Sequence, residues 1–184
     1  DDTIYDGDTT VGFIKYTALH HPWAMVRALP VQVAAIISYA LGKCSKTRMK
    51  SRAFIFLRYL KDVDADVEKY WAKHKHQIKG WYLRQQKEDD VIISASAAFL
   101  LQGICADLGI RHLIATRMDK HTGVIEGENC KGSEKVNRFY EAFPGGEVEE
   151  FYSDHDSDRF MARLAKKSYL VKKNELAEWK IEKE

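Results

Sequence analysis

Side chains able to bind metal and phosphate follow short apolar runs at separate points of the chain. Ser94 comes directly after one such run, Asp154 and Asp158 follow another, and Lys131 lies between them in an Asn-Cys-Lys-Gly segment. Carboxylate oxygens suit Mg²⁺, a lysine can neutralise phosphate charge, and a hydroxyl at a strand end can hold a phosphate oxygen. This order of residue types predicts a magnesium-dependent phosphoryl-transfer site.

These segments and the acidic start of the chain together resemble the four motifs of the haloacid dehalogenase (HAD) superfamily. The chain opens with Asp-Asp-Thr-Ile-Tyr-Asp-Gly-Asp, and the four segments occur in the family's order over nearly the whole length. The resemblance is to the phosphoserine-phosphatase-like branch in particular. It implies a phosphatase that works through an aspartyl-phosphate intermediate, with Mg²⁺ as cofactor and a small phosphorylated metabolite as substrate.

The first motif of that family, Asp-x-Asp-x-Thr at a strand end, fits this chain in two registers. The literal match begins at Asp6 and ends at Thr10. In the other register, Asp1 and Thr3 are the third and fifth motif residues, and the nucleophile lies two positions before Asp1, so the chain as given lacks it. We prefer the second register, because a buried parallel strand needs an apolar run before the motif and only two apolar residues directly precede Asp6.

In the preferred register the resemblance gives each site residue a role. Asp1 would be the general acid and base, and its backbone carbonyl would bind Mg²⁺. Thr3 would be the motif threonine, and Asp8 would be the acidic residue that faces the cap and the substrate. Ser94, together with the backbone N–H of Ala95, would bind the phosphate.

Two lysines compete for the third motif. Lys131 precedes the glycine, as the motif lysine does in the family, so we expect it to pair with the nucleophile and the phosphoryl oxygens. Lys135 lies one helical turn further on, where a lysine on an exposed helix face is ordinarily solvated. In the fourth motif Asp154 would bind Mg²⁺ directly and Asp158 would support the metal shell or the lysine. The expected metal ligands are therefore Asp1, Asp154 and Asp158.

The apolar pattern predicts an α/β fold: a Rossmann-like open parallel sheet flanked by helices, with a helical cap inserted after the first strand. Residues 10–87 form the predicted cap, and residues 1–9 and 88–184 form the predicted core domain. Within the core we expect strands at residues 91–93, 112–115 and 148–152 and a last edge strand at 169–171. Helices are expected at residues 97–108, where Gly109 ends the helix, at 133–143 and at 157–165, with a terminal helix capped by Asn174.

Bulk composition narrows the class of protein without naming a substrate. The chain has 184 residues, 45% of them hydrophobic, and a formal net charge of +2, which is enough for a real core and argues against a nucleic-acid-binding protein driven by bulk charge. Its three cysteines have no metal-type spacing and no signal peptide is visible, so we expect a reduced, cytoplasmic protein. The oligomeric state is left open.

The predicted cap contains an apolar run at residues 31–41 that is followed by several lysines and arginines. The run is too short to span a bilayer, and we prefer a buried cap helix to an interfacial helix that rests on anionic lipid. A second cap segment, residues 67–83, carries Tyr70, Trp71, Trp81 and Tyr82, which we expect to be core packing. Two alternative functions stay open: a lipid-head-group phosphatase resembling those that act on phosphatidylglycerophosphate, and a phosphate-binding module without turnover.

Overall fold

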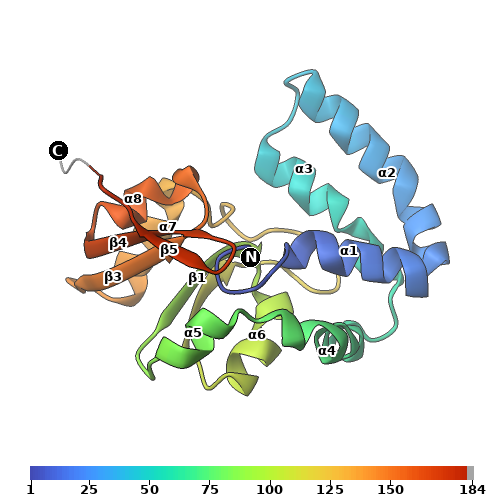
Figure 1. Cartoon of the computed structure of the whole chain (residues 1–184). Helices are drawn as coiled ribbons and strands as arrows, with labels where there is room; N and C mark the ends of the chain where they lie inside the picture. The colour runs from blue at the N-terminus through green and yellow to red at the C-terminus, as the bar shows by residue number, and fades with distance from the viewer. Residues whose placement is uncertain (182–184) are drawn as a thin grey trace.

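The computed structural model describes residues 1–181; residues 182–184, the end of the predicted core domain, lie outside the described part. The first half of the described chain is helical, as predicted (Figure 1). Its elements are α1 (Thr9–His20), α2 (Pro22–Ala40), α3 (Lys46–Ala53), the 3-10 turn η1 (Ile55–Tyr59), α4 (Val63–His74), the turn η2 (Lys75–Gln77) and α5 (Gly80–Gln85).

The second half alternates strands with helices. In chain order it contains β1 (Val91–Ala97), α6 (Ala98–Asp107), β2 (His112–Thr116), α7 (Ser133–Ala142), β3 (Val148–Ser153), the turn η3 (Asp156–Asp158), α8 (Arg159–Ala162), β4 (Ala165–Lys172) and β5 (Glu175–Glu178). β1 pairs in parallel with β2, and β3 pairs in parallel with β4. The predicted α/β fold, with a parallel sheet flanked by helices, is confirmed.

Within residues 1–181 this sheet is in two pieces, one formed by β1 and β2 and the other by β3, β4 and β5. Among these residues, β1 and β3 each have a neighbouring strand on one side only. The first residues of the chain lie between the two pieces, because Asp1 contacts Ser96 near the end of β1 and Thr3 contacts Asp154 just after β3. The carboxyl ends of both parallel pairs therefore meet around residues 1–3.

The prediction for the C-terminal part is wrong in two respects. Residues after Asn174 form β5, antiparallel to β4, instead of a helix. Lys173 has a φ of 55°, and this left-handed residue next to Asn174 makes the tight turn that reverses the chain. As a result β4 is not an edge strand: it lies between β3 and β5.

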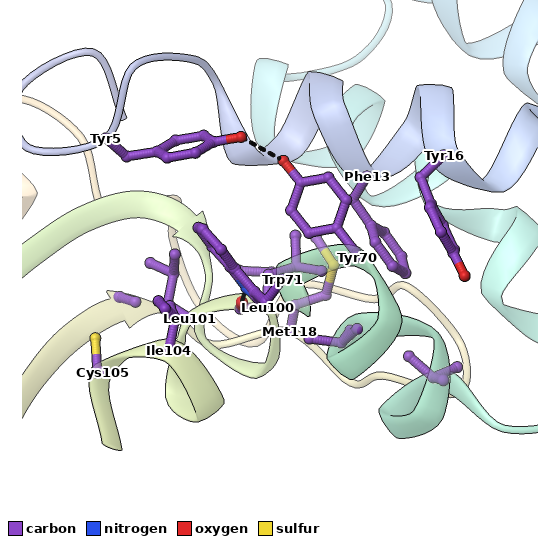
Figure 2. Close-up of a cluster of buried hydrophobic side chains, with 14 of the residues drawn as sticks. Tyr5, Phe13, Tyr16, Tyr70, Trp71, Leu100, Leu101, Ile104, Cys105 and Met118 are labelled. Carbon is purple, nitrogen blue, oxygen red and sulfur yellow. Dashed lines mark hydrogen bonds between the residues drawn. The ribbon is translucent and has the colours of Figure 1, made fainter. Parts of the chain in front are cut away.

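An aromatic cluster joins the first helices to the sheet domain (Figure 2). Tyr5 and Tyr70 share a hydrogen bond between their hydroxyls at 3.0 Å, and Phe13 packs edge-on against Tyr70. Trp71 donates its indole N–H to the carbonyl of Leu100 in α6, at 2.6 Å. Trp81 and Tyr82 are also buried, so the prediction that the aromatic residues of 67–83 are core packing is confirmed.

The helices α2 to α5 lie in two separate places. α4 and α5 lie near α6, whereas α2 and α3 project from the body as a hairpin, which we call the arm (Figure 1). Most of α2 is exposed: its buried residues are Ala24, Ala28 and Ala35. The preference for a buried cap helix at residues 31–41 is therefore wrong, because α2 has neighbours on one face only and its large side chains point away from them.

Candidate functional site

The carboxylate of Asp1 is held at the end of β1 by three hydrogen-bond donors. One oxygen accepts from the backbone N–H of Thr9, at 2.9 Å, and from the Thr9 hydroxyl. The other accepts from the hydroxyl of Ser96. Ser94 is linked to Ser96, because its hydroxyl accepts from the Ser96 N–H at 3.1 Å. Asp1 and the predicted phosphate-binding strand end thus form one hydrogen-bonded unit with a fixed carboxylate orientation.

Thr3 connects the start of the chain to the fourth motif. Its hydroxyl donates to Asp154 Oδ1 at 2.6 Å. Asp1, Lys135 and Asp154 line the same cavity, although they come from segments far apart in the sequence.

Lys135 is the buried lysine of this site. It is 7% exposed, and its ammonium lies 2.6 Å from Asp158 Oδ2 in a buried ion pair. The same carboxylate oxygen accepts from Ser153 at 2.8 Å. The expectation that Lys135 lies on a solvated helix face is wrong: α7 buries Lys135, Arg138 and Phe139, which are spaced i, i+3 and i+4 and so form one face.

Lys131, the lysine chosen from the sequence, is exposed, although it also lines the cavity described below. The spacing of Lys135 to Phe139 was the signal that could have distinguished the two lysines. A lysine placed i, i+4 from a core phenylalanine shares its helix face, and a buried ammonium requires a carboxylate partner such as Asp158.

The loop that precedes α7 is fixed by Arg138. Its guanidinium donates to the carbonyl of Ala115 at 2.8 Å and to the carbonyl of Glu128. Its Nε also pairs with Glu134 at 2.8 Å. Because these contacts join α7, β2 and the loop, they hold the Asn-Cys-Lys-Gly segment in one position next to the strand ends.

A lysine from the arm also enters the site, and the sequence did not single it out. Lys50 of α3 donates to the carbonyl of Ala95 at 2.6 Å and to Asn129 Oδ1 at 2.8 Å. The Thr116 hydroxyl, which has one proton to share between them, lies 2.8 and 3.1 Å from the same two oxygens. Burial lowers the pKa of Lys50 to about 8. The second and third motifs are therefore linked to the arm through one partly buried ammonium group.

A cavity of about 620 Å³ lies between the two pieces of the sheet. Every site residue predicted from the sequence lines it: Asp1, Thr3, Asp8, Ser94, Ala95, Lys131, Asp154 and Asp158. The rest of the lining includes apolar side chains of β1, α6 and β3, aromatic side chains of α4 and α5, and several charged side chains. The structure thus brings the predicted residues together at one place, while their chemical roles remain predictions.

The two registers of the first motif differ in geometry. Asp6 is exposed, its backbone N–H donates to the Gln77 carbonyl at 3.0 Å, and it is not among the residues that line the cavity. Asp1 lines the cavity beside Asp154. Asp8 has a structural task as well, because its carboxylate accepts from the Val11 N–H at 2.9 Å and caps α1.

The donors available to a metal ion are few. Among residues 1–181 there is no group of three or more His, Cys, Asp or Glu side chains that could hold a metal ion by themselves. Mg²⁺ keeps several waters and shares phosphate oxygens, so one carboxylate and one backbone carbonyl suit it. Asp154 fits this requirement best, because Thr3 engages only its Oδ1, whereas the carbonyl oxygen of Asp1 also accepts from the Thr3 N–H. Asp158 fits it less well, because one of its oxygens is engaged by Lys135 and Ser153.

The chain is similar to known proteins over most of its length. A family model described as haloacid dehalogenase-like hydrolase matches residues 1–163. A similar solved structure is the crystal structure of a protein of unknown function from Bordetella pertussis Tohama I, with 19% identity and a TM-score of 0.74 over 91% of this chain and 85% of that chain. At this identity the likeness shows a common fold and nothing of the chemistry. No curated protein matches the chain.

Proposed function

The chain belongs to the haloacid dehalogenase-like hydrolase family, and we propose that it supplies the site of a Mg²⁺-dependent phosphomonoesterase of the phosphoserine-phosphatase-like branch. The observation that carries the proposal is the convergence of Asp1, Lys135 and Asp154 on one cavity at the carboxyl ends of parallel strands. An acid–base carboxylate, a phosphate-neutralising ammonium and a metal-binding carboxylate are the parts that phosphoryl transfer needs. The substrate is a small phosphorylated metabolite.

In this proposal the attacking carboxylate belongs to an aspartate two positions before Asp1. Its oxygen forms a bond to phosphorus as the bond to the substrate oxygen breaks, and Asp1 gives its proton to that leaving oxygen. Asp1 then removes a proton from a water molecule, which attacks the aspartyl-phosphate and releases phosphate. Thr9 and Ser96 donate to the Asp1 carboxylate, and these bonds keep it aimed at the leaving oxygen in both steps.

We assign the phosphate-neutralising role to Lys135 in place of Lys131. A buried ammonium in a low-dielectric site interacts more strongly with a phosphate than an exposed one does. Asp158 and Ser153 hold this ammonium in position, and Ser94 with the N–H of Ala95 would bind a phosphoryl oxygen. Mg²⁺, held by Asp154 and the Asp1 carbonyl, would neutralise part of the phosphoryl charge.

The test is phosphate release from a panel of phosphomonoesters with Mg²⁺ or with EDTA. Two proteins are compared: this chain, and this chain joined at Asp1 to an apolar strand that ends in Asp-Phe. We expect Mg²⁺-dependent turnover only in the extended protein, and none when the added aspartate is replaced by asparagine. Equal turnover in both proteins would move the nucleophile to Asp6, and Asp6→Asn would then abolish it.

Turnover in neither protein would favour a phosphate-binding module without catalysis. Phosphate or a phosphate mimic would then still bind, and Lys135→Met would remove that binding. Isothermal titration with inorganic phosphate separates this outcome from a misfolded protein.

A second candidate substrate is a phosphomonoester on a lipid head group. The observation that favours it is the exposed apolar surface of α2, which the small-metabolite proposal does not use. Including a phosphorylated lipid in mixed micelles in the substrate panel distinguishes the two, because a soluble-metabolite phosphatase has no reason to prefer it.

A further inference from the structure

In α2 of the arm the small side chains are buried and the large apolar ones are exposed, which is the reverse of a helix in the core of a soluble protein. The side chains that α2 turns toward the protein are small: Ala24, Ala28 and Ala35 are buried. The large ones are exposed, at 57% for Val26 and 59% for Ile36. An amphipathic helix ordinarily buries its large apolar side chains and exposes small or polar ones, so this helix has an apolar face without a partner among residues 1–181.

Five of the large exposed apolar residues of α2 form one stripe. Val26, Leu29, Val33, Ile36 and Ile37 are exposed and follow the spacing i, i+3, i+7, i+10 and i+11, which places them on a single side of the helix. Figure 1 shows α2 at the outer side of the arm, away from the sheet. The stripe is therefore continuous and reachable by a large partner.

Charge around the stripe is of one sign. Residues 9–61 contain nine Lys and Arg and no Asp or Glu, although the whole chain has 29 basic and 27 acidic residues. Lys43, Lys46 and Arg48 are exposed at the turn after α2 and on α3. A basic border beside an apolar stripe complements a surface of anionic head groups over acyl chains. Two copies of the arm would repel each other, which argues against a dimer formed arm to arm.

The geometry favours a helix that lies on a bilayer over one that crosses it. α2 has 19 residues, with a mean hydropathy high enough for a span, and such a helix is about 28 Å long. However, α3 lies against it: Gln32 of α2 donates to the carbonyl of Ala53 at 2.8 Å. A spanning α2 would draw the lysines and arginines of α3 into hydrocarbon, which is strongly unfavourable.

We propose that the arm docks on the surface of an anionic bilayer, with the α2 stripe at the acyl boundary and Lys43, Lys46 and Arg48 against the head groups. This docking is independent of the catalytic proposal, because it uses no residue of the cavity. Lys50 is on the same arm and reaches Ala95, so docking brings the site close to the membrane surface.

The test is flotation of the whole chain with vesicles of phosphatidylcholine alone or mixed with phosphatidylglycerol. We expect flotation with the mixed vesicles, weakened by high salt and reversed by alkaline carbonate. Replacing Val33 and Ile36 by glutamine should reduce the bound fraction at limiting lipid by at least about tenfold, since each buried aliphatic side chain contributes strongly to transfer. The matched control replaces Leu83 and Val124, which are 50% and 49% exposed elsewhere.

The basic border has its own pair of variants. Lys43→Gln with Lys46→Gln should weaken binding to mixed vesicles, whereas Lys69→Gln with Lys172→Gln, two exposed lysines outside the arm, should not. Circular dichroism and thermal melts verify that each variant folds. No flotation, equal flotation of stripe and control variants, or retention after carbonate would overturn the proposal. So would a dimer in sedimentation that the stripe variant abolishes.

Discussion

A buried ion pair at the site makes the role of a single lysine measurable. Lys135 and Asp158 lie 2.6 Å apart, each almost fully buried. Removing one partner leaves the other as an uncompensated buried charge, and this is far more costly than removing an exposed charge. Substituting one or the other lysine of the third motif should therefore affect the stability and the activity of the protein differently.

Lys135→Met should lower the free energy of unfolding by roughly 3–5 kcal/mol, whereas Lys131→Met should change it by less than about 0.5 kcal/mol. The measurement is urea denaturation of both variants at one pH. In the extended protein only Lys135→Met should abolish phosphate release. The assignment is wrong if Lys131→Met is the inactive variant.

Lys50 predicts a pH dependence of stability. Its pKa in the folded protein is about 8, below its ordinary value of 10.5. Between these values the unfolded chain binds more protons than the folded one, so this group makes unfolding harder as pH rises. Lys50→Met should remove that contribution. Urea denaturation at intervals from pH 7 to pH 10 should therefore show a shallower rise for Lys50→Met than for the unsubstituted chain.

The control for this prediction is Lys46→Met, an exposed lysine on the same helix. Burial raises the pKa of Tyr70 and Tyr82, and these tyrosines destabilise the folded chain near and above pH 10, where the unfolded chain ionises first. Both tyrosines are present in every variant, so their contribution cancels in the comparison. Identical pH profiles for Lys50→Met and Lys46→Met would contradict the low pKa.

At the scale of elements, the strands and helices of the core could be predicted from the sequence because their apolar residues follow a simple period. The site's strand ends, which carry Ser94 and Asp154, followed from the same pattern. The exposure of α2 could not be predicted, because an apolar run does not say which of its faces meets the protein. β5 was missed since Asn174 serves equally as a helix cap and as a turn residue.

The packing of α1 on α4 depends on a glycine. A Cβ added at Gly12 would lie 2.2 Å from the hydroxyl oxygen of Tyr70. Tyr70 is fully buried, and its hydroxyl shares a hydrogen bond with the hydroxyl of Tyr5, so it has little room to move. Gly12→Ala should therefore lower the free energy of unfolding by about 1–3 kcal/mol through overpacking. Thermal or urea denaturation measures the change.

A second helical glycine provides the comparison. Gly103 lies in α6, with no atom within 4 Å of the position of an added Cβ. Gly103→Ala should raise the free energy of unfolding by about 0.5–1 kcal/mol, because alanine reduces the freedom of the unfolded chain. If both alanine variants are stabilised, the α1–α4 contact is looser than described.

At the scale of the whole molecule, the net charge of +2 conceals a separation of charge. Every Lys, Arg, Asp or Glu in residues 9–61 is a Lys or Arg, so the rest of the chain has more acidic than basic residues. Bulk composition argued only against a nucleic-acid-binding protein. The uneven distribution of charged residues could be counted in the sequence. The inference that it supports membrane docking required the structure, which shows that residues 22–53 form a projecting arm with an exposed apolar stripe.

The split sheet predicts a distinct pattern of amide hydrogen exchange. β4 is paired on both sides at Tyr169 and Leu170, whereas β1 and β3 are each paired on one side only among residues 1–181. Amides bonded in a sheet exchange slowly and unpaired ones exchange fast. Mass spectrometry of peptic peptides should show stronger protection around Tyr169 and Leu170 of β4 than in β1 and β3. In the extended protein, protection of β1 and β3 should rise to the level of β4.

An isolated strand edge is a hazard because each strand that adds to it presents a new edge, and growth continues into a fibre. The edges of β1 and β3 differ from this case, since both border the same cavity. An extended segment that enters the cavity can form backbone hydrogen bonds on both sides at once, and it then leaves no new edge. Strand addition at this place is therefore self-limiting: one segment completes the sheet, and further chains find nothing to extend.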